Sequence, residues 1–130
     1  MNLYGYSPKD IGILGEKVAR EYLRRQGFSI LGTNVRSTFG ELDIVAKIED
    51  TLSFVEVKTL RCNEFPNQHS QHLYDPGENL HAHKIRNVAR MAEWYAGTSG
   101  WDGEWQVDGA LVWLRERDGM ARIRYYPQIL

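Results

Sequence analysis

The sequence predicts an α/β domain in which a mixed central β-sheet is flanked by helices, with the element order α-β-β-β-α-β-β. Apolar residues recur at helical spacing in two segments, 7–28 and 78–97. Apolar runs bounded by turn residues indicate strands at 28–36, 40–48, 51–60, 104–114 and 121–127. A sheet with helices packed on it is the simplest assembly of these elements.

The first helical segment, 7–28, carries signals for both of its ends. Ser7 can cap it, Pro8 suits the first helical position, and Asp10 stands where the acid of a capping box belongs. Gly27 fits a C-terminal cap. We therefore expect a helix that begins just after Ser7 and ends near Gly27.

The second helical segment follows a long polar stretch, 61–77, which contains prolines and a glycine and is expected to be a loop. The apolar stripe of this helix consists of Leu80, Ile85, Val88, Met91, Ala92 and Tyr95. Long loops in compact domains are often functional, and the sequence leaves the role of 61–80 open.

The composition fits a soluble, single-domain protein. A length of 130 residues suggests one domain, 1–130, with room for a core. The net charge of -1 provides no overall basic field for nucleic acid, although a local basic face is compatible with it. The single cysteine excludes an internal disulfide and fits a reducing compartment. Without a bilayer-spanning apolar run or an apolar signal region, we expect a cytoplasmic location and no membrane partner.

Charged residues stand inside the central pair of strands. A turn centred between residues 49 and 50 would place Asp43 opposite Glu56, and Glu41 opposite Lys58. Because side chains alternate along a strand, these four would share one face with Val45 and Phe54. The opposite, apolar face would consist of Leu42, Ile44, Ala46, Val55 and Val57.

Clustered carboxylates on one face have two interpretations. Like charges directly opposed destabilise a sheet, and a divalent cation such as Mg²⁺ would relieve that repulsion through hard oxygen ligands. Alternatively, the face is an exposed sheet end with a cross-strand ion pair between Glu41 and Lys58, which contributes little. The residues alone leave both interpretations open.

Asp43, followed on the next strand by Glu56-Val57-Lys58, resembles the signature of PD-(D/E)XK nucleases. The order of elements is similar to the restriction-endonuclease-like core, and archaeal Holliday-junction resolvases share a similar arrangement. More narrowly, the chain resembles the YraN-like family. The matching pieces span most of the chain: LGEKVAREYLRRQGFSILGTNVR, GELDIVA, FVEVKT, Lys84 ahead of ARMAEWYA, and VDGALVWL.

The resemblance implies a catalytic site that uses Mg²⁺ or Mn²⁺. Asp43 and Glu56 would hold the ion together with the Val57 carbonyl. Lys58 would orient or activate the attacking water and offset charge on the transition state. Glu16 matches an extra acid that reaches the same site from the first helix, although a solvent-facing helix acid is the simpler interpretation of its position alone.

Other positions are matched less directly. Lys84 fits the family pattern and is the preferred phosphate contact, with Arg36 as a second candidate for nucleic-acid binding. No proline precedes Asp43, and Glu41 stands there as an acid that supports the ligands. Residues 106–108 read Gln-Val-Asp where the family usually has Arg-Phe-Asp. The segment between Lys58 and Lys84 is longer than is usual in the family, and it could cover the path of the substrate.

Three functions remain open. The first is a Mg²⁺-dependent endonuclease that hydrolyses phosphodiester bonds in DNA, with branched or damaged DNA as candidate substrates; a homodimer is open, because cutting both strands often needs two sites. The second is a non-catalytic module that keeps the nuclease fold and binds nucleic acid or a partner. The third is a zinc-binding domain built on His69, His72, His81 and His83, for which loop histidines without a metal are the simpler interpretation.

Overall fold

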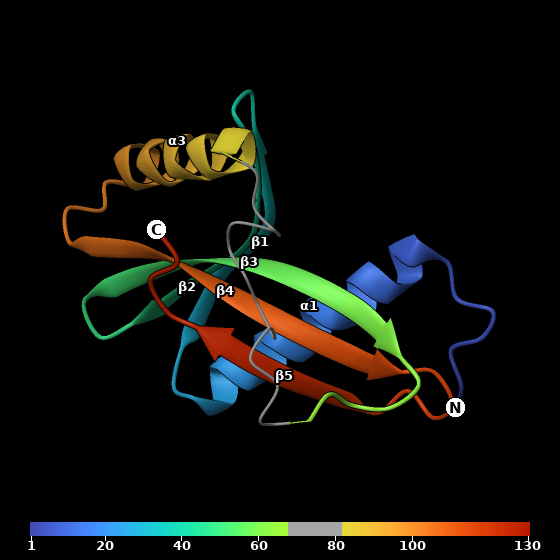
Figure 1. Cartoon of the computed structure of the whole chain (residues 1–130). Coiled ribbons are helices and arrows are strands. Elements are labelled where there is room, and N and C mark those ends of the chain that lie inside the picture. Colours follow the sequence, from blue (N-terminus) through green and yellow to red (C-terminus); the bar gives the residue numbers. More distant parts are fainter. Residues whose placement is uncertain (68–81) are drawn as a thin grey trace.

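A computed structural model of the chain describes residues 1–67 and 82–130, excepting the side chains of residues 82–86, and shows a five-stranded sheet with a helix on each face (Figure 1). The elements in chain order are α1 (Pro8–Arg25), β1 (Ser29–Ser37), β2 (Gly40–Ile48), β3 (Thr51–Cys62), α3 (Ala82–Ser99), β4 (Glu104–Arg115) and β5 (Ala121–Tyr126). This is the predicted order, and the predicted fold class is confirmed.

The strands lie in the sheet in the order of the sequence, β1-β2-β3-β4-β5. The pairs β1–β2, β2–β3 and β4–β5 are antiparallel, whereas β3 and β4 are parallel. A parallel pair needs a crossover connection, and the segment that contains α3 supplies it. The sheet is therefore mixed, as predicted.

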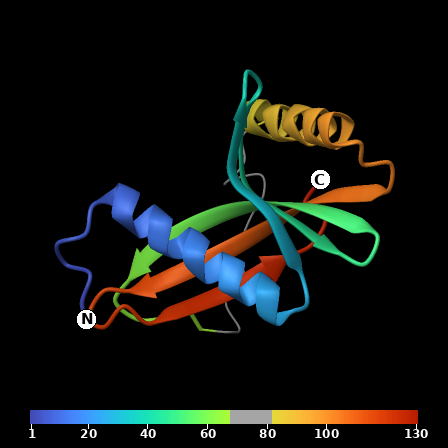
Figure 2. The same ribbon diagram turned by 180° about the vertical axis from the view of Figure 1, so that it is seen from behind.

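Helix α1 packs across one face of the sheet (Figure 2). The predicted capping box is present: the Asp10 amide donates to Ser7 Oγ, and the Ser7 amide donates to the Asp10 carboxylate. Gly27 follows the helix with a φ of 98°, a conformation that favours glycine. The helix approaches the sheet closely at Gly15, where a Cβ would lie 1.8 Å from Thr59 Oγ1. Any side chain there would push α1 away from β3.

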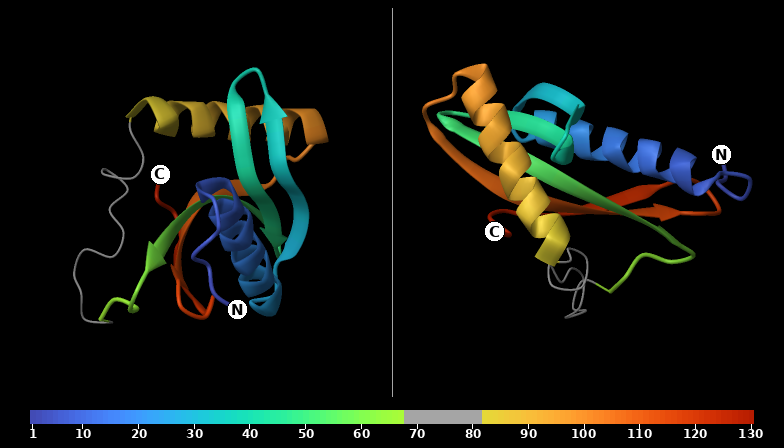
Figure 3. Two further views of the ribbon diagram at one scale, coloured as in Figure 1. Left: turned by 90° about the vertical axis from the view of Figure 1, so that its right-hand side faces the viewer. Right: turned by 90° about the horizontal axis from the view of Figure 1, so that it is seen from above.

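Helix α3 packs on the other face, beside the outer half of the β1–β2 ribbon (Figure 3). The predicted stripe residues Val88, Met91, Ala92 and Tyr95 lie in this second core, together with Phe54. The other two predicted members, at positions 80 and 85, lie outside the described side chains. The helix continues to Ser99, slightly beyond its expected end.

The predicted register of β2 and β3 is confirmed from the Ile48–Thr51 pair to the Ile44–Val55 pair, where this ladder ends. Beyond it, the β1–β2 ribbon swings away from β3 toward α3 (Figure 1). Leu42 consequently packs in the second core with Val45. Its predicted place on the other face, with Ile44, is wrong, because the twist of the ribbon turns its outer half toward a different helix.

No helix in the described part of the chain has both the length and the apolar composition needed to cross a bilayer.

Candidate active site

A cleft of about 430 Å³ opens where β2 separates from β3. Helix α1 forms one of its walls, and the edge of β3 forms another. Its lining residues are Pro8, Ile11, Gly12 and Glu16 from α1, Asp43 from β2, and Glu56, Val57, Lys58, Thr59 and Arg61 from β3. The sequence-predicted residues Glu16, Asp43, Glu56, Val57 and Lys58 are thus brought together from three elements.

Asp43 lies one residue beyond the end of the β2–β3 ladder. Here its side chain, instead of a backbone carbonyl, accepts a hydrogen bond from β3. The Val57 amide donates a hydrogen bond of 2.8 Å to Asp43 Oδ2. A regular antiparallel pair would give this N–H a carbonyl of β2, and the carboxylate stands in for it. Hydrogen bonds to ionised acceptors are stronger than neutral ones. This contact therefore fixes the carboxylate of Asp43 against the Glu56-Val57-Lys58 segment.

Glu56 is 7% exposed and follows Phe54 on the α3 side of β3. It lines the cleft together with Asp43, and both also line a second cavity of about 230 Å³ that is bounded by Glu41 and by Asn87 of α3. The two carboxylates therefore stand between the two cavities, at the point where the sheet splits. Asp43 and Glu56 thus line the same two cavities, although the β2–β3 ladder ends one pair before their predicted pairing.

The backbone of Val57 contributes a further oxygen. In an extended strand, the amide and carbonyl of one residue point toward the same edge. The Val57 amide points toward β2, where it meets Asp43. The Val57 carbonyl is therefore directed to the same edge of β3, beside the carboxylates.

Glu16 and Lys58 complete the cleft from opposite walls. Glu16 is half-buried on α1, and Lys58 is exposed on β3. The position of Glu16 depends on the Gly15–Thr59 contact next to it, because that contact sets how closely α1 approaches β3. A carboxylate from α1 and an amine from β3 therefore line the same cleft.

The donors in this cleft suit a hard divalent cation better than zinc. Among the described residues, no three His, Cys, Asp or Glu side chains are grouped as ligands for one ion. A structural zinc site needs four such ligands, whereas Mg²⁺ is commonly held by one or two carboxylates and keeps several waters. Two carboxylates and a backbone carbonyl match the second pattern.

Glu41 and Arg36 lie outside the cleft, on the β1–β2 ribbon. They are directly opposed across β1 and β2, with 3.7 Å between Arg36 Nε and Glu41 Oε2. The predicted pairing of Glu41 with Lys58 is wrong, because the β2–β3 ladder ends before reaching them. Glu41 instead lines the smaller cavity beside Asp43, a position that suits a supporting acid.

Lys84 lies in the first turn of α3, and its side chain is outside the described residues. Asn87, one turn later, lines the smaller cavity with both carboxylates. Of the four histidines, His69, His72 and His81 lie outside the described residues, as does the side chain of His83. The zinc hypothesis therefore stays a prediction, and the role of the 61–80 segment stays open.

Sequence reasoning overlooked Asn87, Gly15 and Arg61. Arg61 lines the cleft, but its guanidinium is engaged in structure: Nε lies 2.7 Å from Glu116 Oε1, and the other nitrogens donate to backbone carbonyls of the N-terminal segment. A signal for Gly15 was present, because a glycine inside a helix costs stability and indicates a packing reason.

Asp108 occupies the segment where the chain departs from the usual Arg-Phe-Asp. Its side chain is 0% exposed. Oδ1 accepts from Gln106 Nε2 at 2.9 Å and from the Gln128 amide at 2.8 Å, and Oδ2 accepts from the Tyr125 hydroxyl. Burial, together with this bond to Asp108, raises the pKa of Tyr125 far above its ordinary value. Gln106, which stands where the family usually has arginine, therefore belongs to a network of hydrogen bonds around Asp108.

The order of elements, with an acid on one strand and Glu-X-Lys on the next, defines a restriction-endonuclease-like domain of the PD-(D/E)XK class. Residues 15–122 match the family described as Uncharacterised protein family UPF0102, and the chain belongs to this family, the YraN family of that class.

Relatives of this family cover most of the chain. A UPF0102 protein of Syntrophotalea carbinolica is 38% identical over 122 residues, which are 94% of this chain and 92% of the relative. A UPF0102 protein of Campylobacter jejuni is 37% identical over 97 residues, which are 75% of this chain and 78% of the relative. These names state no activity, so a function has to be argued from the site.

Proposed function

We propose that the chain is a Mg²⁺-dependent endonuclease that hydrolyses phosphodiester bonds in DNA. The observation that carries this proposal is the meeting of Asp43, Glu56 and Lys58 in one cleft, with Asp43 bonded to the Val57 amide at 2.8 Å. Membership of the PD-(D/E)XK class supports the same reaction. Branched or damaged DNA is the substrate class that the likeness to junction resolvases favours.

The carboxylates of Asp43 and Glu56 and the Val57 carbonyl would hold Mg²⁺, or Mn²⁺ in its place. The bound ion would lower the pKa of water and offset negative charge on the phosphoryl group. Lys58 Nζ, which can only donate hydrogen bonds, would orient the attacking water and contact a phosphate oxygen. The Glu16 carboxylate would accept a hydrogen bond from that water across the cleft.

The reaction is a hydrolysis at phosphorus. The water oxygen bonds to phosphorus, the bond from phosphorus to the leaving sugar oxygen breaks, and that sugar oxygen takes up a proton. Preorganised charges around the phosphoryl group are the main source of rate in such a reaction. Arg36, outside the cleft, and Lys84 would contact phosphates of the bound strands.

In this proposal the protein is cytoplasmic, and it acts on DNA without a membrane partner. A homodimer would allow both strands to be cut. Measurement of the particle size in solution, with and without four-way DNA, tests whether the chain forms a homodimer.

Cleavage of a panel of linear, flap and four-way DNA substrates, with and without Mg²⁺, tests the activity. We expect metal-dependent cutting that Asp43→Ala and Lys58→Ala abolish, whereas Asp50→Ala, which changes an exposed turn residue, leaves it intact. The proposal is wrong if the folded protein cuts none of these substrates, or if the two site variants cut as well as the wild type.

A non-catalytic module is the competing function, and the same assay identifies it. Such a module would bind DNA or a protein partner without cutting. Its binding would be unaffected by Mg²⁺ and by Glu56→Gln.

A further inference from the structure

A groove of about 510 Å³ lies between α1 and the edge strand β1. Its lining residues are Ile13, Glu16, Arg20 and Arg24 from α1 and Ile30, Leu31, Gly32, Thr33 and Asn34 from β1. None of these residues belongs to the parts of the chain that the structure leaves undescribed.

The groove adjoins the candidate active site at Glu16, which lines both. Arg20 and Arg24 follow Glu16 at four-residue intervals, so the three side chains lie along one face of α1. The arginines stand ~6 Å and ~12 Å farther along the helix axis than Glu16. A chain of phosphates that leaves the cleft past Glu16 would meet both guanidinium groups in succession.

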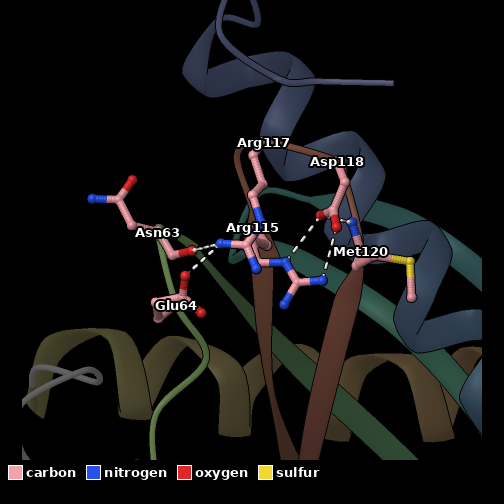
Figure 4. A network of polar contacts seen from close by, with 6 residues as sticks. All are labelled: Asn63, Glu64, Arg115, Arg117, Asp118 and Met120. Carbon is pink, nitrogen blue, oxygen red and sulfur yellow. Dashed lines mark hydrogen bonds and ion pairs between the residues drawn. The ribbon is translucent and has the colours of Figure 1, made fainter.

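The charges of these two arginines are not neutralised by ion pairing within the described residues, where the structure records no carboxylate within bonding distance of either. The arginines of the β4–β5 turn differ (Figure 4). Arg115 donates two hydrogen bonds to Asp118, which lower the pKa of that carboxyl to about 2, and Arg117 pairs with Glu64. Unlike these two arginines, Arg20 and Arg24 present to the groove a charge that no carboxylate of the described residues pairs with.

The opposite wall of the groove offers apolar and backbone surface. Leu31 is the extra residue where the β1–β2 register shifts, and its side chain is 49% exposed. Ile13 on α1 is 55% exposed. Exposed apolar side chains beside unpaired guanidinium groups suit a ligand with sugar and phosphate groups in alternation, and guanidinium matches phosphate geometry in a bidentate manner.

We propose that this groove binds the sugar–phosphate backbone of the substrate on one side of the scissile bond, with Arg20 and Arg24 contacting neighbouring phosphates. The inference rests on the proposed function, because it assigns the track of the same substrate. The proposal assigns phosphate binding to Arg20 and Arg24, but not to the third arginine at the C-terminal end of α1. Arg25, which is adjacent in sequence, lines a different hollow with Tyr22 and Ile123.

Fluorescence anisotropy of a labelled DNA duplex and of its labelled single strand, both in EDTA and over a series of salt concentrations, tests the inference. We expect the double variant Arg20→Gln/Arg24→Gln to bind at least about 10-fold more weakly at low salt. The slope of log K against log salt should become shallower by about 1.8 for the duplex, or about 1.4 for the single strand, because two phosphate contacts are lost. Arg25→Gln, the matched control, should stay within about twofold of the wild type with an unchanged slope.

The charge-preserving variant Arg20→Lys/Arg24→Lys guards against a folding defect. It should keep the wild-type salt slope, since the phosphate contacts are ionic. Equal weakening by the Arg25 variant, or wild-type slopes for the double glutamine variant, would overturn the groove assignment.

Cleavage by the same proteins separates this inference from the proposed function. If the wild type cuts and the double glutamine variant binds and cuts equally well, the groove assignment fails and the nuclease stands. If the wild type cuts nothing but its binding depends on Arg20 and Arg24 and not on Arg25, the groove assignment stands and the nuclease fails.

Discussion

Two aspartates inside the sheet, Asp43 and Asp108, have opposite surroundings. Asp108 is fully buried, and hydrogen-bond donors from Gln106, Tyr125 and the Gln128 backbone enclose its carboxylate. Asp43 is half-buried where two strands part, and its carboxylate is held by one edge of β3 while it lines two cavities.

The contrast shows that the surroundings of a carboxylate, rather than its place in a strand, indicate its role. A carboxylate enclosed by donors is stabilised and cannot reach a ligand. One that is held in place and open to a cleft, beside a second carboxylate and a lysine, can bind a cation or a phosphate. The Asp108 region should therefore affect stability, and the Asp43 region should affect chemistry.

The largest expected effect is on catalysis. Asp43→Asn keeps the shape of the side chain but removes its charge, and should lower the rate of Mg²⁺-dependent cleavage by about 10³-fold. Thermal melting should change little, because the amide oxygen can still accept from Val57. Asp50→Asn in the exposed β2–β3 turn is the control and should leave the rate unchanged. A rate within threefold of the wild type for Asp43→Asn would remove the distinction between the two regions.

The second effect is on stability. Asp108→Ala leaves the part-buried Tyr125 hydroxyl and Gln128 amide without their acceptor, and should lower the free energy of unfolding by about 2 kcal/mol. Urea denaturation measures it, with Asp50→Ala as the control. The folded fraction should still cut at nearly the wild-type rate. A loss of cleavage without a loss of stability would place Asp108 in the catalytic site instead.

The third effect links the two properties. Gly15→Ala would force α1 away from Thr59, and overpacking of this kind typically costs about 1–3 kcal/mol. The shift should also slow cleavage, because Glu16 moves with the helix. For stability, Gly12→Ala is the matched control: its Cβ would meet nothing within 4 Å, so it should leave stability unchanged or raise it by up to about 1 kcal/mol. Equal stability of the two variants would argue against the close helix–strand contact.

The smallest effect appears only at alkaline pH. The folded state raises the pKa of Tyr125 above the ordinary value of 10.0, mainly through burial. Above pH 10, the unfolded chain loses this proton while the folded chain keeps it, so stability should fall by up to about 1.4 kcal/mol per pH unit. Tyr125→Phe should remove that part of the decline between pH 10 and 11, and Tyr4→Phe, at an exposed position, should not. Identical pH profiles for the wild type and Tyr125→Phe would contradict the buried Asp108–Tyr125 bond.

Local signals in the sequence were sufficient for much of the fold. The start of α1 follows from Ser7 and Asp10, and the β2–β3 register follows from a turn at residues 49–50. Asp43 and Glu56 directly follow the last pair of that register, Ile44 and Val55. Such features depend on residues close in sequence, for which hydrogen bonding and alternation leave few choices.

Features that depend on distant segments were beyond such reasoning. The separation of β2 from β3, which placed Leu42 under α3 and paired Glu41 with Arg36, arises from the twist of a whole ribbon. The contact of Gly15 with Thr59 and the presence of Asn87 beside the carboxylates require the packing of helices on the sheet. The groove at Arg20 and Arg24 likewise depends on how α1 lies against β1.

The proposed function requires that Asp43, Glu56 and the Val57 carbonyl together bind a divalent cation. A crystal soaked in Mn²⁺, with anomalous data collected, tests it most directly. We expect a single strong peak within bonding distance of both carboxylates and of the Val57 carbonyl, which is lost in a soaked crystal of Asp43→Asn. No peak at this position at high Mn²⁺, in crystals where the cleft is open to solvent, would contradict the account.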